Sequence, residues 1–151
     1  MDDIDRKIIS ILSDNASATA TEIMSQVNLS IPAINKRISK LRQSGLIRKF
    51  TVILDPQKAG KSIQAFILVV LNQPSDATKF IEYTQADADI LECYAVTGEY
   101  DYILKVCARD VANLEKKLNI LKQQKFIVKS YTMLSLMEHK YQATVLPDNE
   151  E

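Results

Sequence analysis

Residues 19–45 read TATEIMSQVNLSIPAINKRISKLRQSG, a pattern that predicts two short helices joined by a tight turn. Thr19 and Glu22 fit a capping box, in which each side chain accepts a hydrogen bond from a backbone N–H group at the start of a helix. The turn is predicted at Asn28–Ser30, and Ser30 is expected to cap the second helix with Pro32 in its first turn. That helix would bury a stripe formed by Ile31, Ile34, Ile38 and Leu41.

A further helix and a strand flank this pair. Helical spacing of apolar residues predicts a first helix from the Asp2/Asp3 cap to about Asp14. Leu46–Leu54 is rich in β-forming residues, so we expect a strand, or wing, that closes at Asp55-Pro56. Three short helices followed by a wing predict a winged helix-turn-helix over residues 1–55.

Positive charge is concentrated in this part although the chain is neutral overall. Lys plus Arg and Asp plus Glu both total 19, which excludes a uniformly basic surface. Between Glu22 and Lys49, however, six basic residues accompany one acidic residue. This segment is therefore the candidate polyanion-binding surface, and the alternative is the solvated face of a three-helix unit.

A helix that reads a DNA groove needs small or hydrogen-bonding side chains near its start and cations further along for phosphates. The predicted helix that begins after Ser30 has this order of side chains on its polar face. The candidate contacts to double-stranded DNA are Ser30, Ala33, Asn35, Lys36, Arg37, Ser39, Lys40 and Arg48.

The second half of the chain has the pattern of a sheet with helices. Residues 56–61 carry Pro56 and Gly60 and are predicted to be a linker. Strands are expected at Ile63–Leu71, Ile90–Thr97, Tyr100–Ala108 and Ile127–Tyr141, with helices at Ser75–Ala86 and Asp110–Gln124. The order βαββαβ predicts a ferredoxin-like domain over residues 62–142, a flexible tail at 143–151, and the α+β class for the whole chain.

The first of these strands is apolar on both faces. Residues 66–71 read FILVVL, whereas a sheet with helices on one side should alternate apolar and polar residues. A second copy of the same sheet is the simplest cover for the other face, so we expect a homodimer.

The composition argues against catalysis and against a membrane segment. Three glycines, one histidine (His139) and two cysteines leave no phosphate-binding glycine loop, no metal site and no catalytic set, so we expect neither an enzyme nor a cofactor. The acidic N-terminus and short apolar runs predict no membrane contact and a cytoplasmic protein. Cys93 and Cys107 would lie opposite one another if the hairpin were centred on Tyr100, although reduced thiols are expected in the cytoplasm.

Several motifs together are similar to one family of transcription factors. They are residues 3–9 (DIDRKII), 29–34 (LSIPAI), 37–41 (RISKL), 44–47 (SGLI) and 97–102 (TGEYDY). On these residues the chain resembles the leucine-responsive regulator/asparagine-regulator (Lrp/AsnC) family over nearly its whole length. The resemblance implies a winged helix-turn-helix joined to a ferredoxin-like effector domain, homodimers that often assemble into octamers, and an amino acid effector held between dimers near the glycine-containing loop.

The glycine-containing loop can also be interpreted from its residues. Gly98 permits a tight turn that exposes N–H groups to a carboxylate, and Asp101 can accept an ammonium group. The alternative is a plain hairpin in which Gly98 satisfies the turn and Asp101 is a surface charge. Tyr100 is a further candidate whose alternative role is packing, and Thr132 and Leu134 on the last strand complete the candidate effector-binding residues.

These features support a sequence-specific DNA-binding transcriptional regulator controlled by a small effector. The alternative is a ligand-independent protein that wraps DNA and organises the chromosome. A third hypothesis, a metabolite-binding or enzymatic ferredoxin-like protein with N-terminal helices used only for assembly, conflicts with the basic segment at Lys36–Lys49.

Overall fold

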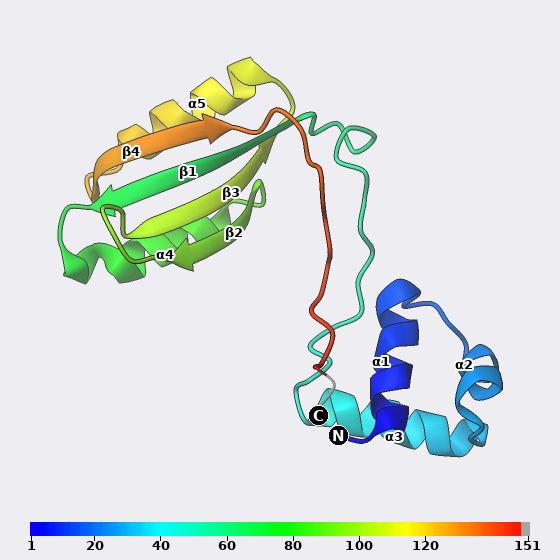
Figure 1. Ribbon diagram of the computed structural model, residues 1–151. Helices are drawn as coiled ribbons and strands as arrows, with labels where there is room; N and C mark the ends of the chain where they lie inside the picture. The colour runs from blue at the N-terminus through cyan, green and yellow to red at the C-terminus, as the bar shows by residue number, and fades with distance from the viewer. Residues whose placement is uncertain (149–151) are drawn as a thin grey trace. The chain divides into compact units, whose positions relative to one another are not determined.

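The structure is a computed structural model that describes residues 1–148, and these residues form two compact units (Figure 1). One unit contains Met1–Ile53 and the segment from Lys140 onward, and the other contains Leu54–His139. The exact domain boundaries predicted from the sequence, at residues 55, 61 and 142, stay predictions. Of the predicted tail, residues 149–151 lie outside the described residues.

The first unit is built from three helices, α1 (Asp3–Asp14), α2 (Ala20–Val27) and α3 (Ile31–Gln43). They pack around one apolar core because their apolar residues recur at helical spacing. This core contains Ile8, Ile9, Leu12, Ile23, Val27, Ile34 and Leu41. The predicted helix-turn-helix is confirmed in position. Of its predicted stripe, Ile34 and Leu41 are buried and Ile38 packs against the core, but Ile31 is 38% exposed, so its place in the stripe was wrong.

Local hydrogen bonds fix the helix ends in this unit, and one predicted cap, that of Ser30, needs correction. Thr19 and Glu22 form the predicted capping box at the start of α2. Asn28 ends α2 in the left-handed conformation with φ 52°, which asparagine tolerates better than most residues. Ser30 occupies the N-cap position of α3, but its side chain makes no capping hydrogen bond there. The predicted Ser30 cap is therefore wrong in its hydrogen bond, although Pro32 does lie in the first turn.

The strand predicted at Leu46–Leu54 is also wrong. These residues form no β-ladder, and within residues 1–148 the sheet consists of four other strands. A strand needs a neighbour to pair its backbone N–H and C=O groups, and β-forming side chains alone do not supply one. Val52 is 80% exposed as a result. The segment instead contacts α3 through Phe50, whose ring lies 5.8 Å from the Arg42 guanidinium carbon.

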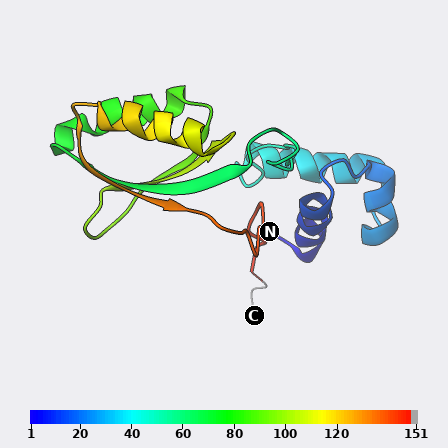
Figure 2. The same cartoon turned by 90° about the horizontal axis from the view of Figure 1, so that it is seen from above.

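The second unit has the predicted βαββαβ order. Its elements are β1 (Ile63–Leu71), the 3-10 turn η1 (Pro74–Asp76), α4 (Ala77–Ala86), β2 (Ile90–Ala95), β3 (Tyr102–Ala108), α5 (Val111–Lys122) and β4 (Ile127–Leu134). The strands form an antiparallel sheet in the order β2-β3-β1-β4. Both helices lie on one face of this sheet (Figure 2). The α+β class and the ferredoxin-like arrangement are confirmed.

Alternate residues of β1 point to opposite faces of the sheet. Ala65, Ile67, Val69 and Leu71 are buried and belong to the core cluster that also holds Phe80 of α4. The alternate residues Phe66, Leu68 and Val70 are only half-buried on the face opposite the helices. The predicted doubly apolar strand therefore has one face in the core and one apolar face without helices.

Two details of register differ from expectation. Strand β4 ends at Leu134 rather than Tyr141: its last pairing partner, Ala65, lies two residues from the start of β1 at Ile63, and Ser135 N–H adds a further bond, to Gln64 O at 2.9 Å. The β2–β3 hairpin pairs Cys93 with Leu104, whereas Cys107 pairs with Gln64 of β1, so both thiols are free. The closing pair is Ala95–Tyr102, which shifts the hairpin centre away from Tyr100 and rules out the opposed cysteines.

Candidate DNA-binding and effector sites

The polar face of α3 is the candidate DNA-binding surface. Ser30, Asn35, Lys36, Ser39 and Lys40 are all exposed or nearly so. Ala33 is half-buried at the edge of this face, close to the buried Ile34. Because Ile34, Ile38 and Leu41 pack toward the core, helical geometry turns positions 35, 36, 39 and 40 outward. The surface thus has small and amide side chains near the helix start and cations in its second half.

Three of the predicted cations are available to a polyanion. Lys36, Lys40 and Arg48 are exposed, and among the described residues 1–148 none of them forms an ion pair. Such side chains neutralise phosphates without first breaking an internal contact. Ser39 is held differently, because it accepts a hydrogen bond from the Gln43 amide at 3.3 Å.

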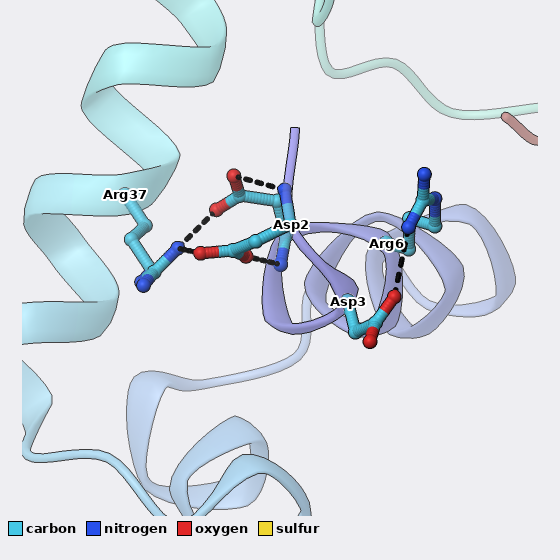
Figure 3. Close-up of polar contacts among 5 residues, drawn as sticks. Asp2, Asp3, Arg6 and Arg37 are labelled. Atoms are coloured by element: carbon cyan, nitrogen blue, oxygen red, sulfur yellow. Dashed lines mark hydrogen bonds and ion pairs between the residues drawn. The ribbon is translucent and has the colours of Figure 1, made fainter. Parts of the chain in front are cut away.

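Arg37 does not share this availability. Its Nη1 atom lies 2.7 Å from Asp2 Oδ2 and 2.7 Å from Asp5 Oδ1, both at the start of α1 (Figure 3). Hydrogen bonds to Asp5 and Asp2 raise the pKa of Arg37 above its usual value. A backbone hydrogen bond from Asp5, followed by the bond from Arg37, lowers the pKa of Asp2. The prediction that Arg37 faces DNA overlooked these carboxylates, which lie more than thirty residues away in the sequence.

The loop between β2 and β3 is the candidate effector loop. Val96 N–H donates to Asp101 O at 2.9 Å and closes the loop across its base, and Asp101 N–H donates to Val69 O at 2.9 Å and anchors the loop to β1. Gly98 has φ 116°, a conformation that favours glycine, while no atom lies within 4 Å of the point that a Cβ would occupy there. The glycine is therefore required by backbone conformation and not by crowding.

Asp101 has a structural role that sequence interpretation missed. Its Oδ2 atom accepts a hydrogen bond from Leu71 N–H at 2.7 Å, at the end of β1. Its Oδ1 atom has no hydrogen-bond partner among residues 1–148, which leaves that oxygen for an incoming group. The alternative interpretation, in which Asp101 is only a surface charge, leaves out this bond from the end of a neighbouring strand.

A depression of about 480 Å³ lies beside this loop. It is formed by the end of β1 and the segment that follows, the start of α4, the end of β2 and the start of β3. Its lining residues are Val70, Leu71, Asn72, Gln73, Pro74, Ala77, Ala95, Val96, Asp101 and Tyr102. The walls are mainly apolar, and Asp101 supplies a carboxylate. Of these residues only Asp101 was predicted, because the others come together solely through the sheet topology.

Of the remaining effector candidates, Tyr100 lies in the loop, and Thr132 and Leu134 lie on β4. The Lys129 ammonium stands 4.9 Å from the centre of the Tyr100 ring, so Tyr100 reaches toward β4. Thr132 pairs with Ile67 in the middle of β1, and Leu134 pairs with Ala65 in its first half. The loop and the depression are at the other end of that strand. One chain therefore does not bring Thr132 and Leu134 next to Gly98 and Asp101.

An ion-pair cluster, unpredicted from the sequence, ties the start of the second unit to its body. Lys61 Nζ lies 2.6 Å from Asp89 Oδ1, and Lys117 Nζ of α5 lies 3.0 Å from Asp89 Oδ2 and 2.7 Å from Asp87 Oδ2. The hydrogen bond from Lys61 is the main cause that lowers the pKa of Asp89. Charges that compensate each other in this way are structural, and they give the cluster no free group for chemistry.

Two other kinds of feature bear on function, metal sites and membrane-spanning helices. Within residues 1–148, no three His, Cys, Asp or Glu side chains are grouped in a way that could hold a metal ion. None of the helices in this described part is both long and apolar enough to cross a membrane.

Comparison with known families gives two matches that together cover most of the chain. Residues 1–48 match the winged helix-turn-helix DNA-binding family, and residues 64–145 match the Lrp/AsnC ligand binding domain. The first match contains α1 to α3, and the second contains the sheet, the effector loop and the depression.

Individual relatives agree with these matches. The chain is 37% identical over 150 residues to the HTH-type transcriptional regulator FL11 of Pyrococcus horikoshii, covering 97% of this chain and 96% of the relative. It is 32% identical over 118 residues to the regulatory protein AsnC of Haemophilus influenzae, covering 78% and 79%. A transcriptional regulator of Neisseria meningitidis solved in complex with L-Met superposes with a TM-score of 0.91 at 27% identity, covering 96% of each chain. The structure of E. coli AsnC gives 0.89 at 25% identity, covering 97% of this chain and 99% of that one.

Proposed function

We propose a separate role for each of the two units, starting from the fact that the chain belongs to the Lrp/AsnC family of DNA-binding transcriptional regulators. The polar face of α3 reads DNA sequence, and an amino acid with an apolar side chain binds in the depression beside the Gly98 loop to control that reading. The observation that carries the proposal is the exposed face of α3, which joins an amide side chain to unpaired cations.

The DNA-binding role of α3 assigns a task to each exposed side chain. Ser30, Ala33 and Asn35 lie in the first half of the motif, where a recognition helix approaches base edges, and an asparagine amide can bond an adenine edge with two hydrogen bonds. Lys36, Lys40 and Arg48 neutralise phosphates, and Ser39 adds a hydrogen bond to the backbone of the DNA. Arg37 is left out of this set because its guanidinium is held by Asp2 and Asp5.

A second copy of the chain supplies the second DNA-reading helix. The face of the sheet without helices carries Phe66, Leu68 and Val70 of β1. Their pairing partners on β4 and β3 add the apolar Tyr131, Met133 and Ile103 together with two lysines, Lys105 and Lys129. A surface of this apolar character is stabilised by burial against a copy of itself. In the resulting homodimer two α3 helices reach two half-sites about one turn of DNA apart. Assembly of dimers into an octamer is the further step that the family suggests.

The chemistry of the depression selects the class of effector. An amino acid offers an ammonium group to Asp101 Oδ1 and a carboxylate to N–H groups of the loop around Gly98. Its side chain then meets mainly apolar walls, where a charged group would lose its hydration without a partner. Thr132 and Leu134, which lie away from this loop within one chain, contribute from a neighbouring chain of the assembly.

Two measurements test this proposal. In vitro selection of DNA from a random pool should enrich one sequence, with an affinity at least about a thousandfold above that for random DNA. Calorimetry and mass measurement with a panel of amino acids should show binding of leucine, isoleucine, valine or methionine, and none of aspartate or lysine. Enrichment of no sequence, together with tight salt-dependent binding to all DNA and no effector, would support the DNA-wrapping alternative instead.

A further inference from the structure

The contacts of Arg37 form a closed arrangement with the first turn of α1. Asp2 and Asp5 make a capping box, in which Asp5 N–H donates to Asp2 Oδ1 at 2.8 Å and Asp2 N–H donates to Asp5 Oδ2 at 3.3 Å. Each carboxylate thus uses one oxygen for the helix cap. The second oxygen of each, Asp2 Oδ2 and Asp5 Oδ1, accepts from Arg37 Nη1 at 2.7 Å (Figure 3). A single nitrogen of α3 therefore joins both halves of the cap of α1.

The side chain of Arg37 also lies where it can position α3. It stands one turn from the buried residues Ile34 and Leu41, and only 30% of it is exposed. The neighbouring Lys36 and Lys40 are exposed to solvent on the DNA-reading face. The guanidinium thus fixes the middle of α3 to the start of α1, beside the apolar contacts of the core.

Electrostatics separate this role from phosphate binding. Two carboxylates share one guanidinium, so the group around Arg37 carries a net negative charge when all three are ionised. Because Nη1 is the Arg37 nitrogen that bonds both carboxylates, a DNA phosphate that approached Arg37 could meet only its Nη2 or Nε and would meet the repulsion of Asp2 and Asp5. Arg37 consequently adds little to the general attraction for DNA, in contrast to Lys36 and Lys40.

We infer that Arg37 is a positioning residue for DNA recognition: it sets the orientation of α3 through Asp2 and Asp5, and it does not itself bind phosphate. Recognition of base edges depends on hydrogen-bond geometry, which small rotations of the helix disturb. Binding to random DNA depends on the count of available cations and tolerates such rotations. The inference rests on the proposed function of α3 and adds a residue that acts through another helix.

The test compares the affinity ratio between selected and random DNA with the slope of log affinity against log salt on random DNA. Asp5→Asn removes one of the two charges that hold Arg37, the less exposed one, while it keeps every cation of α3 and an oxygen for the cap. Arg37→Gln removes the same contact from the other side. We expect both variants to lower the affinity ratio about tenfold and to leave the salt slope unchanged. Arg37→Lys, whose ammonium has three donors for the two carboxylates, should retain most of the ratio.

The opposite pattern would overturn the inference. If Arg37→Gln reduces the salt slope by about one, as Lys36→Gln should, and Asp5→Asn leaves the ratio unchanged, Arg37 is a phosphate contact. Asp5→Asn decides the matter alone if Arg37→Gln fails to fold. A wild-type protein that selects no sequence contradicts the proposed function and this inference together, whereas selection with unchanged ratios in both variants contradicts only the inference.

Discussion

The two candidate sites of this protein are built in different ways. The DNA-reading surface is built mainly on one helix, α3, where its residues from Ser30 to Lys40 follow each other in the sequence and only Arg48 lies beyond the helix. The effector depression is assembled from the end of β1, the start of α4, the end of β2 and the start of β3. A site on one periodic element can be found from its spacing alone. A site made from several elements appears only when the topology is known.

The difference also explains what sequence reasoning could and could not predict. The capping box Thr19–Glu22, the stripe Ile34–Leu41 and the limits of β1 follow from local patterns, and the structure has them at the same residues. The pairing of Arg37 with Asp2 and Asp5, and the bond from Leu71 to Asp101, join residues at least thirty positions apart. Such contacts depend on how distant segments pack, so no local sequence pattern predicts them.

The largest expected effect comes from the two faces of β1. Val69→Lys places a charge in the core beside the helices, where Val69 is fully buried, and should lower the free energy of unfolding by about 3–5 kcal/mol. Phe66→Lys, on the face without helices, should leave the chain folded but monomeric. Thermal unfolding and light scattering measure the two outcomes. A folded dimer carrying Phe66→Lys would show that this face is not the interface.

A smaller effect is expected at Asp101, where structure and effector binding coincide. Asp101→Ala leaves Leu71 N–H without its acceptor and should lower the free energy of unfolding by about 1–3 kcal/mol. Asp101→Asn is the matched control, because its amide oxygen can accept that bond but carries no charge for an ammonium group. Denaturant unfolding and calorimetry should therefore show a stable Asn variant that has lost the effector. Effector binding equal to wild type in the Asn variant would remove Asp101 from the site.

The second unit should also respond to acid through the cap of α5. Hydrogen bonds from Asn113, first from its side chain and then from its backbone, and a further bond from Arg109 lower the pKa of Asp110 from 3.8 to about 2. A lowered carboxyl pKa stabilises the folded state above pH 4, and this contribution is lost as the pH falls toward 2. Asp110→Asn, which still caps a helix, should flatten the dependence of stability on pH in that range. Parallel curves for wild type and variant would exclude this contribution.

The smallest effect on stability is expected on the DNA-reading face. Lys36→Ala and Lys40→Ala should change the free energy of unfolding by less than about 0.5 kcal/mol, because both side chains are exposed and unpaired among the described residues. Each should nevertheless reduce the slope of log affinity against log salt by about one on any DNA. Titrations at several salt concentrations measure this slope. An unchanged slope in both variants would move the phosphate contacts away from α3.

The most direct test of the central claim, that α3 reads DNA sequence, is a base-by-base affinity measurement with wild type and Asn35→Ala. Asn35 is exposed in the first half of α3, where its amide can meet an adenine edge. We predict a loss of about 1–3 kcal/mol in discrimination at one position of the selected DNA and wild-type discrimination at the others. Equal weakening on every sequence, or no weakening at all, would contradict that claim.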